Sequence, residues 1–256
     1  MKRLVMTMLL AAMMSRPAVA ASDSYAGVKT IGIVSAIGTE LQIGDEVSIP
    51  LDPSDRIRTD NWDIDKRVVA WTTQALSQRF SVQPVAYDAR KVAACVVLEV
   101  CLPALIAANR LDAYVIVHYD RGFDWYRHDD FRGLGMDVLH GIIARKYGFF
   151  AAYQVSVYSV NGKRLDFGNP YLPGGYMASY FDADAQLWPK DPRAPTAAEL
   201  AAVEEHIARL VQMTLPAALA NAELAPPPAK YDMDTMKTWI SGDKPIPFFV
   251  DGTAAK

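Results

Sequence analysis

Apolar residues along the chain alternate between strand-like and helix-like spacing. Val28 to Ile37 is β-branched and nearly all apolar, as expected for a strand buried on both faces. Ile64 to Arg79 instead repeats apolar residues at helical spacing, which predicts an amphipathic helix. Leu111 to Tyr119 and Phe150 to Val160 return to the strand pattern. Asn161-Gly162 then predicts a hairpin turn, because both residues accept positive φ.

Weaker signals lie between these elements. Leu41 to Ile49 predicts a short second strand, and Phe80 to Tyr87 predicts a strand that Pro84 restricts to an edge or a bulge. Residues 88–110 are rich in alanine and leucine and predict mainly helix. We expect Pro103 in the first turn of its helix, where a missing N–H costs least.

The clearest helix follows a long connection rich in glycine, proline and aspartate. Thr196 is its expected N-cap, and Glu199 completes a capping-box pattern, so the helix spans about Ala197 to Ala222. Three consecutive prolines then end the domain, and residues 226–256 predict an extended Pro-rich tail. Its apolar side chains indicate that part of the tail docks, because they would otherwise remain in water: Ile246, Phe248 and Phe249.

The order of these elements predicts one globular domain over residues 21–225. Its class is α/β or α+β, with a single mixed β-sheet, helices packed mainly on one face and a long carboxy-terminal helix.

The amino-terminal segment has the pattern of a secretory signal. Lys2 and Arg3 precede an apolar run from Leu4 to Met14, and Ala18-Val19-Ala20 supplies the small residues that a signal peptidase accepts. We expect residues 1–20 to be removed and the mature protein to be soluble, in the periplasm or secreted. The apolar run is shorter than the roughly 20 residues that cross a bilayer, and no later segment reaches that length.

Charge excludes two classes of partner. Removing residues 1–20 takes away three basic residues and no acid, so the formal charge falls from −3 to −6. Nucleic acids and anionic lipids both reward a basic stripe, which this chain lacks. We therefore expect no nucleic-acid partner, while the oligomeric state stays open.

The chain has two cysteines, Cys95 and Cys101. An oxidising compartment favours a disulfide between them. Positions i and i+6 of one helix point too far apart for a bridge, so pairing requires a loop or an irregular turn in this segment. Two buried free thiols are the alternative, and the spacing does not match a Cys-x-x-Cys redox motif.

Signature motifs of serine hydrolases, zinc proteases and nucleotide-binding proteins are absent from the sequence. We therefore assign no catalytic residue, no metal site and no cofactor. The weak metal candidates are His118, at a predicted strand end, and Asp120 and His128, which follow it in the sequence. Their side chains carry nitrogen and oxygen donors. The many aspartates in this region leave an exported metal- or carboxylate-dependent hydrolase as the alternative function.

The most informative segment runs from Tyr119 to Arg132 and interleaves aromatic residues with arginines. Such residues dominate protein–protein interface hot spots, and here they follow a predicted strand, where a scaffold presents a loop. The candidate partner-binding residues are Phe123, Trp125, Tyr126, Arg127 and Phe131. The alternative is that these aromatics fold back and cap the sheet. A second aromatic stretch, Tyr171 to Tyr180, is a candidate for the same surface.

Three segments carry a family resemblance: Thr30–Ala36, Leu111–Tyr119 and Ala151–Leu165. Their order resembles a group of Gram-negative envelope proteins that includes the amino-terminal domain of the Tol–Pal β-propeller protein, the curli secretion lipoprotein and transport-auxiliary lipoproteins. The chain departs from the lipoproteins because no lipidated cysteine follows its signal segment. The resemblance implies a non-enzymatic module that docks to other envelope components. We therefore expect its partner to be another envelope protein or a lipid-like molecule.

Overall fold

A computed structural model describes residues 23–45, 56–95, 98–119, 133–140, 145–170, 180–183, 188–192, 194–229 and 232–249 of the chain. The described residues form a nine-stranded mixed sheet. Its strands are β1 (Thr30–Ala36), β2 (Glu40–Asp45), β3 (Arg56–Arg58), β4 (Ser81–Gln83), β5 (Ala113–Tyr119), β6 (Gly133–His140), β7 (Arg145–Ser159), β8 (Arg164–Gly168) and β9 (Tyr180–Ala183). The helices are η1 (Asp23–Tyr25), α1 (Ile64–Leu76), α2 (Ala89–Ala93), α3 (Leu98–Asn109), α4 (Ala197–Asn221) and α5 (Met233–Ile240).

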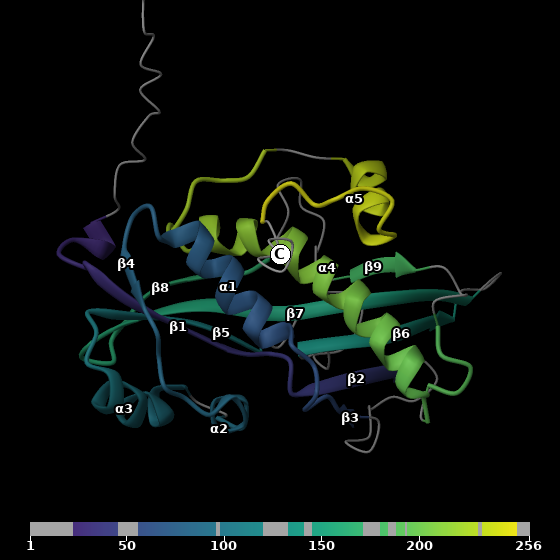
Figure 1. Cartoon of the computed structure of the whole chain (residues 1–256), viewed down its shortest axis with the longest axis horizontal. Helices are drawn as coiled ribbons and strands as arrows, with labels where there is room; N and C mark the ends of the chain where they lie inside the picture. The colour runs from purple at the N-terminus through teal and green to yellow at the C-terminus, as the bar shows by residue number, and fades with distance from the viewer. Residues whose placement is uncertain are drawn as a thin grey trace, which may run out of the picture.

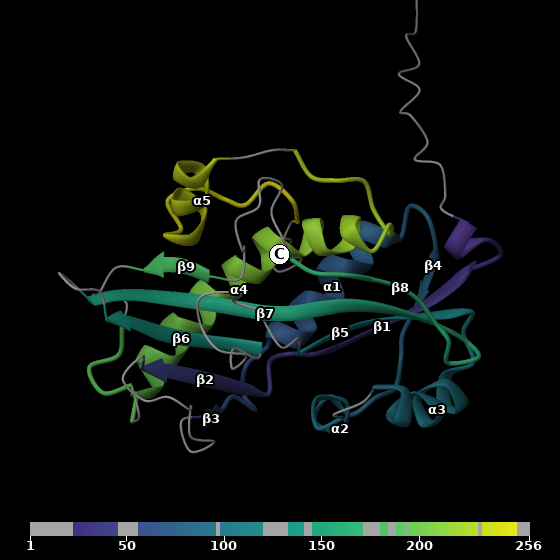
Figure 2. The same ribbon diagram turned by 180° about the vertical axis from the view of Figure 1, so that it is seen from behind.

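The long strand β7 organises the sheet (Figure 1). Its first half pairs antiparallel with β6 and β9, and its second half pairs antiparallel with β5 and β8. β5 and β6 lie end to end along one edge of β7, while β8 and β9 lie along the other edge (Figure 2). β1 and β2 then pair in parallel with β5 and β6, and β4 and β3 finish that side of the sheet.

Alternation along the strands divides the core between the two faces of the sheet. Val115 and Val117 of β5 join the larger hydrophobic core, which includes residues of α1, α4 and α5. Tyr114 and Ile116 point the other way and pack in a smaller core with Leu102 and other residues of α3. The two longest helices therefore cover one face, and the shorter α2 and α3 cover part of the other, as expected for an α+β domain.

Helix α4 begins where the sequence predicts. The Thr196 hydroxyl accepts from the backbone N–H of Glu199, and the Glu199 carboxylate accepts from the Thr196 backbone N–H at 2.8 Å. This capping box satisfies two of the N–H groups that every helix start leaves unpaired. The prediction of a capped, long carboxy-terminal helix is confirmed.

Pro103 lies further inside its helix than predicted. Helix α3 starts at Leu98, so Pro103 is beyond the first turn. The carbonyl that its missing N–H would have bonded belongs to Glu99, an exposed residue of the first turn. Water can satisfy that carbonyl, which lowers the usual cost of a proline within a helix.

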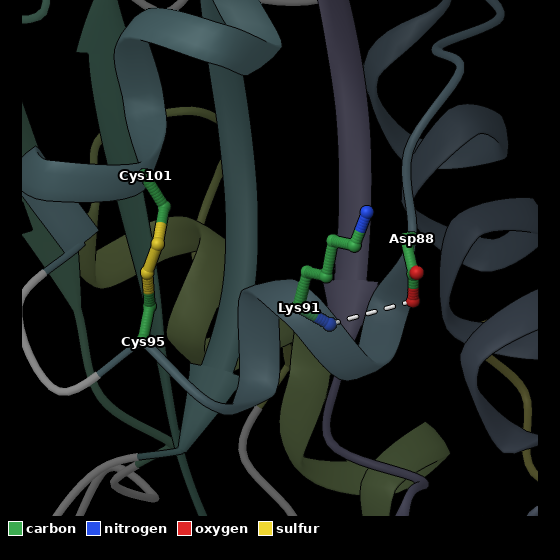
Figure 3. Close-up of a disulfide and its surroundings, with 4 residues drawn as sticks. All are labelled: Asp88, Lys91, Cys95 and Cys101. Carbon is green, nitrogen blue, oxygen red and sulfur yellow. Dashed lines mark hydrogen bonds between the residues drawn. A yellow bond between two sulfur atoms is a disulfide. The ribbon is translucent and has the colours of Figure 1, made fainter.

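A disulfide joins Cys95 and Cys101, whose Cα atoms are 6.4 Å apart (Figure 3). Cys95 lies in the connection after α2, and Cys101 lies in α3. The two residues therefore do not share one helix, which is the condition that pairing required. Nearby, the Asp88 carboxylate caps α2 by accepting from the backbone N–H groups of Arg90 and Lys91.

The chain after Pro226 is not extended throughout, because it contains α5. Asp232 caps this helix by accepting from the Thr235 backbone N–H at 2.7 Å. The segment contributes five buried side chains to the larger core: Met236, Trp239, Ile240, Ile246 and Phe249. Phe248 packs against it partly buried. Apolar docking against α4 therefore orders a segment whose composition alone resembles a tail.

The long helix α4 holds this segment with polar side chains as well. His206 Nδ1 contacts the Ile240 carbonyl at 3.1 Å, and Arg209 donates to the Trp239 carbonyl at 3.3 Å. Gln212 donates to the Phe249 carbonyl at 3.0 Å. These three side chains are spaced three residues apart on α4, so they form one row beneath the docked segment. No helix among the described residues is long and apolar enough to span a bilayer.

Candidate functional site

The connection between β5 and β6 interrupts the sheet without shifting its register. Tyr119, the last residue of β5, pairs with Tyr153 of β7, and Gly133, the first residue of β6, pairs with Ala152. The chain therefore leaves the sheet and returns to it at neighbouring positions of β7. We call residues 120–132 the first connection. It contains all the predicted partner-binding residues, which lie outside the described residues: Phe123, Trp125, Tyr126, Arg127 and Phe131.

The two ends of the first connection are packed against each other. Gly133 has φ +70°, and a Cβ atom at this position would collide with the Tyr119 ring. The Tyr119 hydroxyl lies 2.7 Å from Thr39 Oγ1. Burial raises the pKa of that hydroxyl to about 12, so it stays protonated and available as a hydrogen-bond donor at neutral pH.

The neighbouring bend between β1 and β2 is held by one carboxylate from α1. Asp65 accepts from the Ser35 hydroxyl at 2.7 Å and from the backbone N–H groups of Ile37 at 2.9 Å and Gly38 at 3.2 Å. The Thr59 hydroxyl donates to the Gly38 carbonyl at 2.7 Å. Hydrogen bonds to a charged acceptor are among the stronger ones in proteins, so the strand beside Tyr119 is firmly positioned.

A chain of polar side chains crosses β7 next to these ends. His118 Nε2 lies 2.9 Å from Ser156 Oγ, and Ser156 donates to Gln154 Oε1 at 3.0 Å. Gln154 donates to Asn169 Oδ1 at 3.0 Å. These hydrogen bonds link β5, β7 and Asn169, the residue that follows β8, and so cross three adjacent strands of the sheet.

The other ring nitrogen of His118 fixes the tautomer of the neutral ring. Nδ1 lies 2.9 Å from the Tyr119 carbonyl, which can only accept, so Nδ1 carries a proton. A neutral His118 can accept only at Nε2, where it competes with Gln154 Oε1 for the single hydroxyl proton of Ser156, whereas a protonated ring donates to Ser156. The pKa of His118 is lowered to about 4, mainly by burial and more weakly by Arg164, while the Tyr119 carbonyl and Glu99 act in the opposite direction. The neutral ring therefore prevails at neutral pH.

A second connection joins β8 to β9, which both pair with the opposite edge of β7. It begins and ends near the same residues of β7 as the first connection. Gly168, the last residue of β8, pairs with Val155, and Tyr180, the first residue of β9, pairs with Phe150. We call residues 169–179 the second connection. Asn169 at its start is held by Asn221 of α4, which donates to the Asn169 carbonyl at 2.8 Å. Both connections are therefore attached to β7 between Phe150 and Val155.

The weak metal candidates are not brought together among the described residues. His118 directs one ring nitrogen at a carbonyl and the other at a serine hydroxyl. Asp120 and His128 lie outside the described residues. Within the part of the chain that the structure describes, no group of three or more histidine, cysteine, aspartate or glutamate side chains could hold a metal ion.

Sequence reasoning missed Gln154, Ser156 and Asn169. The signal was present, because Tyr153 to Tyr158 reads Tyr-Gln-Val-Ser-Val-Tyr. Gln154 and Ser156 are polar at alternate positions of an otherwise apolar strand, which places both on one sheet face. Since Ser156 is fully buried, its polar group has to find a partner inside the protein.

Two solved structures resemble the chain at low similarity. A lipoprotein from Neisseria meningitidis is 12% identical with a TM-score of 0.30, over 62% of this chain and 89% of that protein. A hypothetical protein from Chlamydia trachomatis is 9% identical with a TM-score of 0.25, over 73% of this chain and 98% of that protein. No protein-family model matches the chain, and no curated protein matches it. At these TM-scores neither likeness assigns a function.

Proposed function

We propose that this protein is an exported, non-enzymatic envelope module that binds another envelope protein through the first connection, residues 120–132. The observation that carries the proposal is the pairing of Tyr119 and Gly133 with adjacent residues of β7. The sheet keeps its register across the interruption, so the first connection is an insertion that the pairing of the strands does not require. Insertions on a rigid scaffold are where binding residues concentrate.

The composition of the insertion favours a protein partner. Trp, Tyr and Arg are enriched at interface hot spots because they combine large contact area with directional hydrogen bonds. Trp125, Tyr126 and Arg127 are consecutive in the middle of the first connection. Acidic residues in the same segment make it unsuited to an anionic lipid surface.

The direct test is photo-crosslinking in the native compartment, with a photoreactive residue in place of Trp125. We expect a discrete crosslinked protein that mass spectrometry identifies. The control position is Ala202, which is exposed on α4. The absence of a crosslinked product at both Trp125 and Ala202 would refute the proposal. A lipid adduct at Trp125 would show that the partner is lipid-like and not a protein.

The double variant Trp125→Ala/Tyr126→Ala separates binding from packing. We expect it to lose the crosslinked species, followed from a photoreactive residue at Phe123, while the Tm stays within a few degrees of the wild type. Aromatics that cap the sheet would behave differently, since truncating a buried aromatic costs about 3–5 kcal/mol. A large fall in Tm would therefore assign these side chains to the core.

A further inference from the structure

We infer that two copies of this chain associate through the outward face of helix α3, packed antiparallel about a two-fold axis. This interface shares no residue with the first connection, so it goes beyond the proposed function. Its occupant is a second copy of the chain, and the surface consists of residues that the structure describes.

The outward face of α3 is apolar where a surface helix is ordinarily polar. Its exposed residues include only one polar side chain: Glu99, Val100, Pro103, Ala104, Ala107 and Ala108. Val100 exposes 77% of its surface. The opposite face of the helix is buried in the smaller core through Leu98, Leu102 and Leu105. Since a helix that is apolar on all sides is normally covered on all sides, we expect a further element against the outward face.

Two more exposed apolar side chains lie on the same side of the sheet as α3. Val160 and Phe167 complete the set of large hydrophobic residues that are exposed among the described residues. Phe167 pairs with Ser156, and Val160 lies two residues after Tyr158 and still donates its N–H to the β5 side. Alternation therefore places both on the face that carries Tyr158. The Tyr158 hydroxyl in turn donates to Glu99 in the first turn of α3 at 3.1 Å.

The patch made of α3, Val160 and Phe167 is held rigidly. A Cβ atom on Gly162, in the turn between β7 and β8, would lie 3.9 Å from Ile106 Cδ1 of α3. The disulfide from Cys101 attaches the first half of α3 to the connection after α2. Both ribbon views show α3 at the margin of the molecule, across the sheet from α1 and α4 (Figures 1 and 2).

Charges at the two ends of α3 favour a second copy as the occupant. Glu99 lies in the first turn, Arg110 follows the last residue, and both are exposed. In an antiparallel pair of identical helices related by a two-fold axis, the start of each lies beside the end of the other. Glu99 of each copy then lies beside Arg110 of the partner subunit, so the favourable contact occurs twice. Ala104 and Ala107 between them are small enough for close approach of the two helix axes, to about 8 Å.

The same charges disfavour a lipid surface. Helices that lie on membranes carry lysine and arginine along the edge of their apolar face. Residues Leu98–Asn109 contain one acidic residue and no basic residue.

The size of the patch determines the strength of the association. With 12 residues, α3 is about 18 Å long and about 10 Å wide. Stable interfaces bury about 800 Å² on each partner, which is more than one face of this helix provides. Val160 and Phe167 enlarge the patch without closing that gap. We therefore expect a weak dimer in equilibrium with the monomer.

Sedimentation equilibrium of the purified full-length exported protein at increasing concentration measures this association. We expect a reversible monomer–dimer equilibrium. Ala104→Glu places two like charges beside the two-fold axis and should weaken the dimer at least tenfold. Ala202→Glu, the same exchange at an exposed position of α4, is the matched control and should have no effect. A protein that stays monomeric, or a dimer that both variants affect equally, would overturn the inference.

Charge reversal tests the antiparallel geometry. Glu99→Arg alone sets arginine against arginine across the interface, and Arg110→Glu alone sets carboxylate against carboxylate. Each variant should therefore dimerise several-fold more weakly than the wild type, with a Tm within a few degrees of it. An equal mixture of the two should regain at least the wild-type strength, because both contacts then join opposite charges. A folded mixture that stays as weak as its components would refute the antiparallel pairing.

Two further readouts distinguish other occupants. Phosphatidylcholine vesicles should not bind the protein, and vesicle binding that Ala104→Glu abolishes would replace the second copy with a lipid surface. Trp125→Ala/Tyr126→Ala should leave the dimer unchanged. Loss of the dimer in that variant would assign the association to the first connection and overturn the α3 interface. Failure of crosslinking at Trp125 with an intact dimer would instead refute the proposed function alone.

Discussion

Gly133 packs against the aromatic ring of Tyr119, across the two ends of the first connection. The close approach needs a residue without Cβ, and the backbone of Gly133 has φ +70°, which favours glycine independently. One glycine therefore meets two separate requirements where the chain re-enters the sheet.

Replacing Gly133 with alanine should lower the free energy of unfolding by about 2–4 kcal/mol. The left-handed backbone accounts for about 1 kcal/mol, and overpacking against Tyr119 adds about 1–3 kcal/mol. Urea denaturation measures the change. Gly27→Ala is the matched control, because Gly27 has φ +85° and a Cβ atom added there would meet no other atom within 4 Å. Equal losses in the two variants would show that the Tyr119 ring contributes nothing.

The free energy of unfolding should decrease as the pH is lowered from 6.5 to 4, because of His118. Its pKa in the folded protein, about 4, lies below the ordinary value of 6.5, mainly through burial. The unfolded chain therefore binds the proton first as the pH falls, and the stability that is fully present above pH 6.5 is lost on the way down to pH 4. The expected loss is at most about 3 kcal/mol.

Chemical denaturation at several pH values, with wild type and His118→Gln side by side, isolates this contribution. The difference in unfolding free energy between the two proteins should change across the window and level off below pH 4. A difference independent of pH would mean that His118 has an ordinary pKa in the folded protein.

Truncating Phe249 should release the docked carboxy-terminal segment. Phe249 is buried, stacks on Trp71 of α1 with ring centroids 6.2 Å apart, and its carbonyl accepts from Gln212. Phe249→Ala should lower the free energy of unfolding by about 3 kcal/mol. It should also make the backbone at Lys237 and Lys244, whose side chains are already exposed, easier for trypsin to cleave. Phe167→Ala, at an exposed aromatic, should change stability by less than about 0.5 kcal/mol. Cleavage at Lys244 in the wild type, with the sheet still folded, would show that the segment is not docked.

Reduction should destabilise the α2–α3 region. A disulfide closing a loop as short as Cys95 to Cys101 removes chain entropy worth about 2 kcal/mol from the unfolded state. Thermal unfolding with and without dithiothreitol measures the difference. Cys95→Ser/Cys101→Ser provides the control, because its Tm should not respond to the reductant. A wild-type Tm that is also unaffected would contradict the prediction.

Elements with a strong local signal were predicted from the sequence. β1 and β5 are apolar and β-branched, and α4 has its capping box, so local preference and burial agree. The mixed sheet and its α+β class follow from the order of these elements. In each case, the residues that define the element are contiguous.

Elements defined by distant contacts were missed. β6 begins Gly-Leu-Gly, and glycine weakens a strand prediction, yet both glycines are needed beside Tyr119 and Phe150. α5 is short, and its apolar side chains are buried by packing on distant residues, those of α4 among them. The polar chain from His118 to Asn169 was also missed, because its members are brought together only by the pairing of β5, β7 and β8.

The pairing of Tyr119 and Gly133 with adjacent residues of β7 makes the stretch between them exchangeable. Since the strands are aligned without it, lengthening this stretch costs chiefly loop-closure entropy, about 0.6 kcal/mol for each doubling of length. Foreign peptides or reporter tags grafted there would leave the scaffold intact. Related chains could likewise diverge in what they recognise while retaining one common framework.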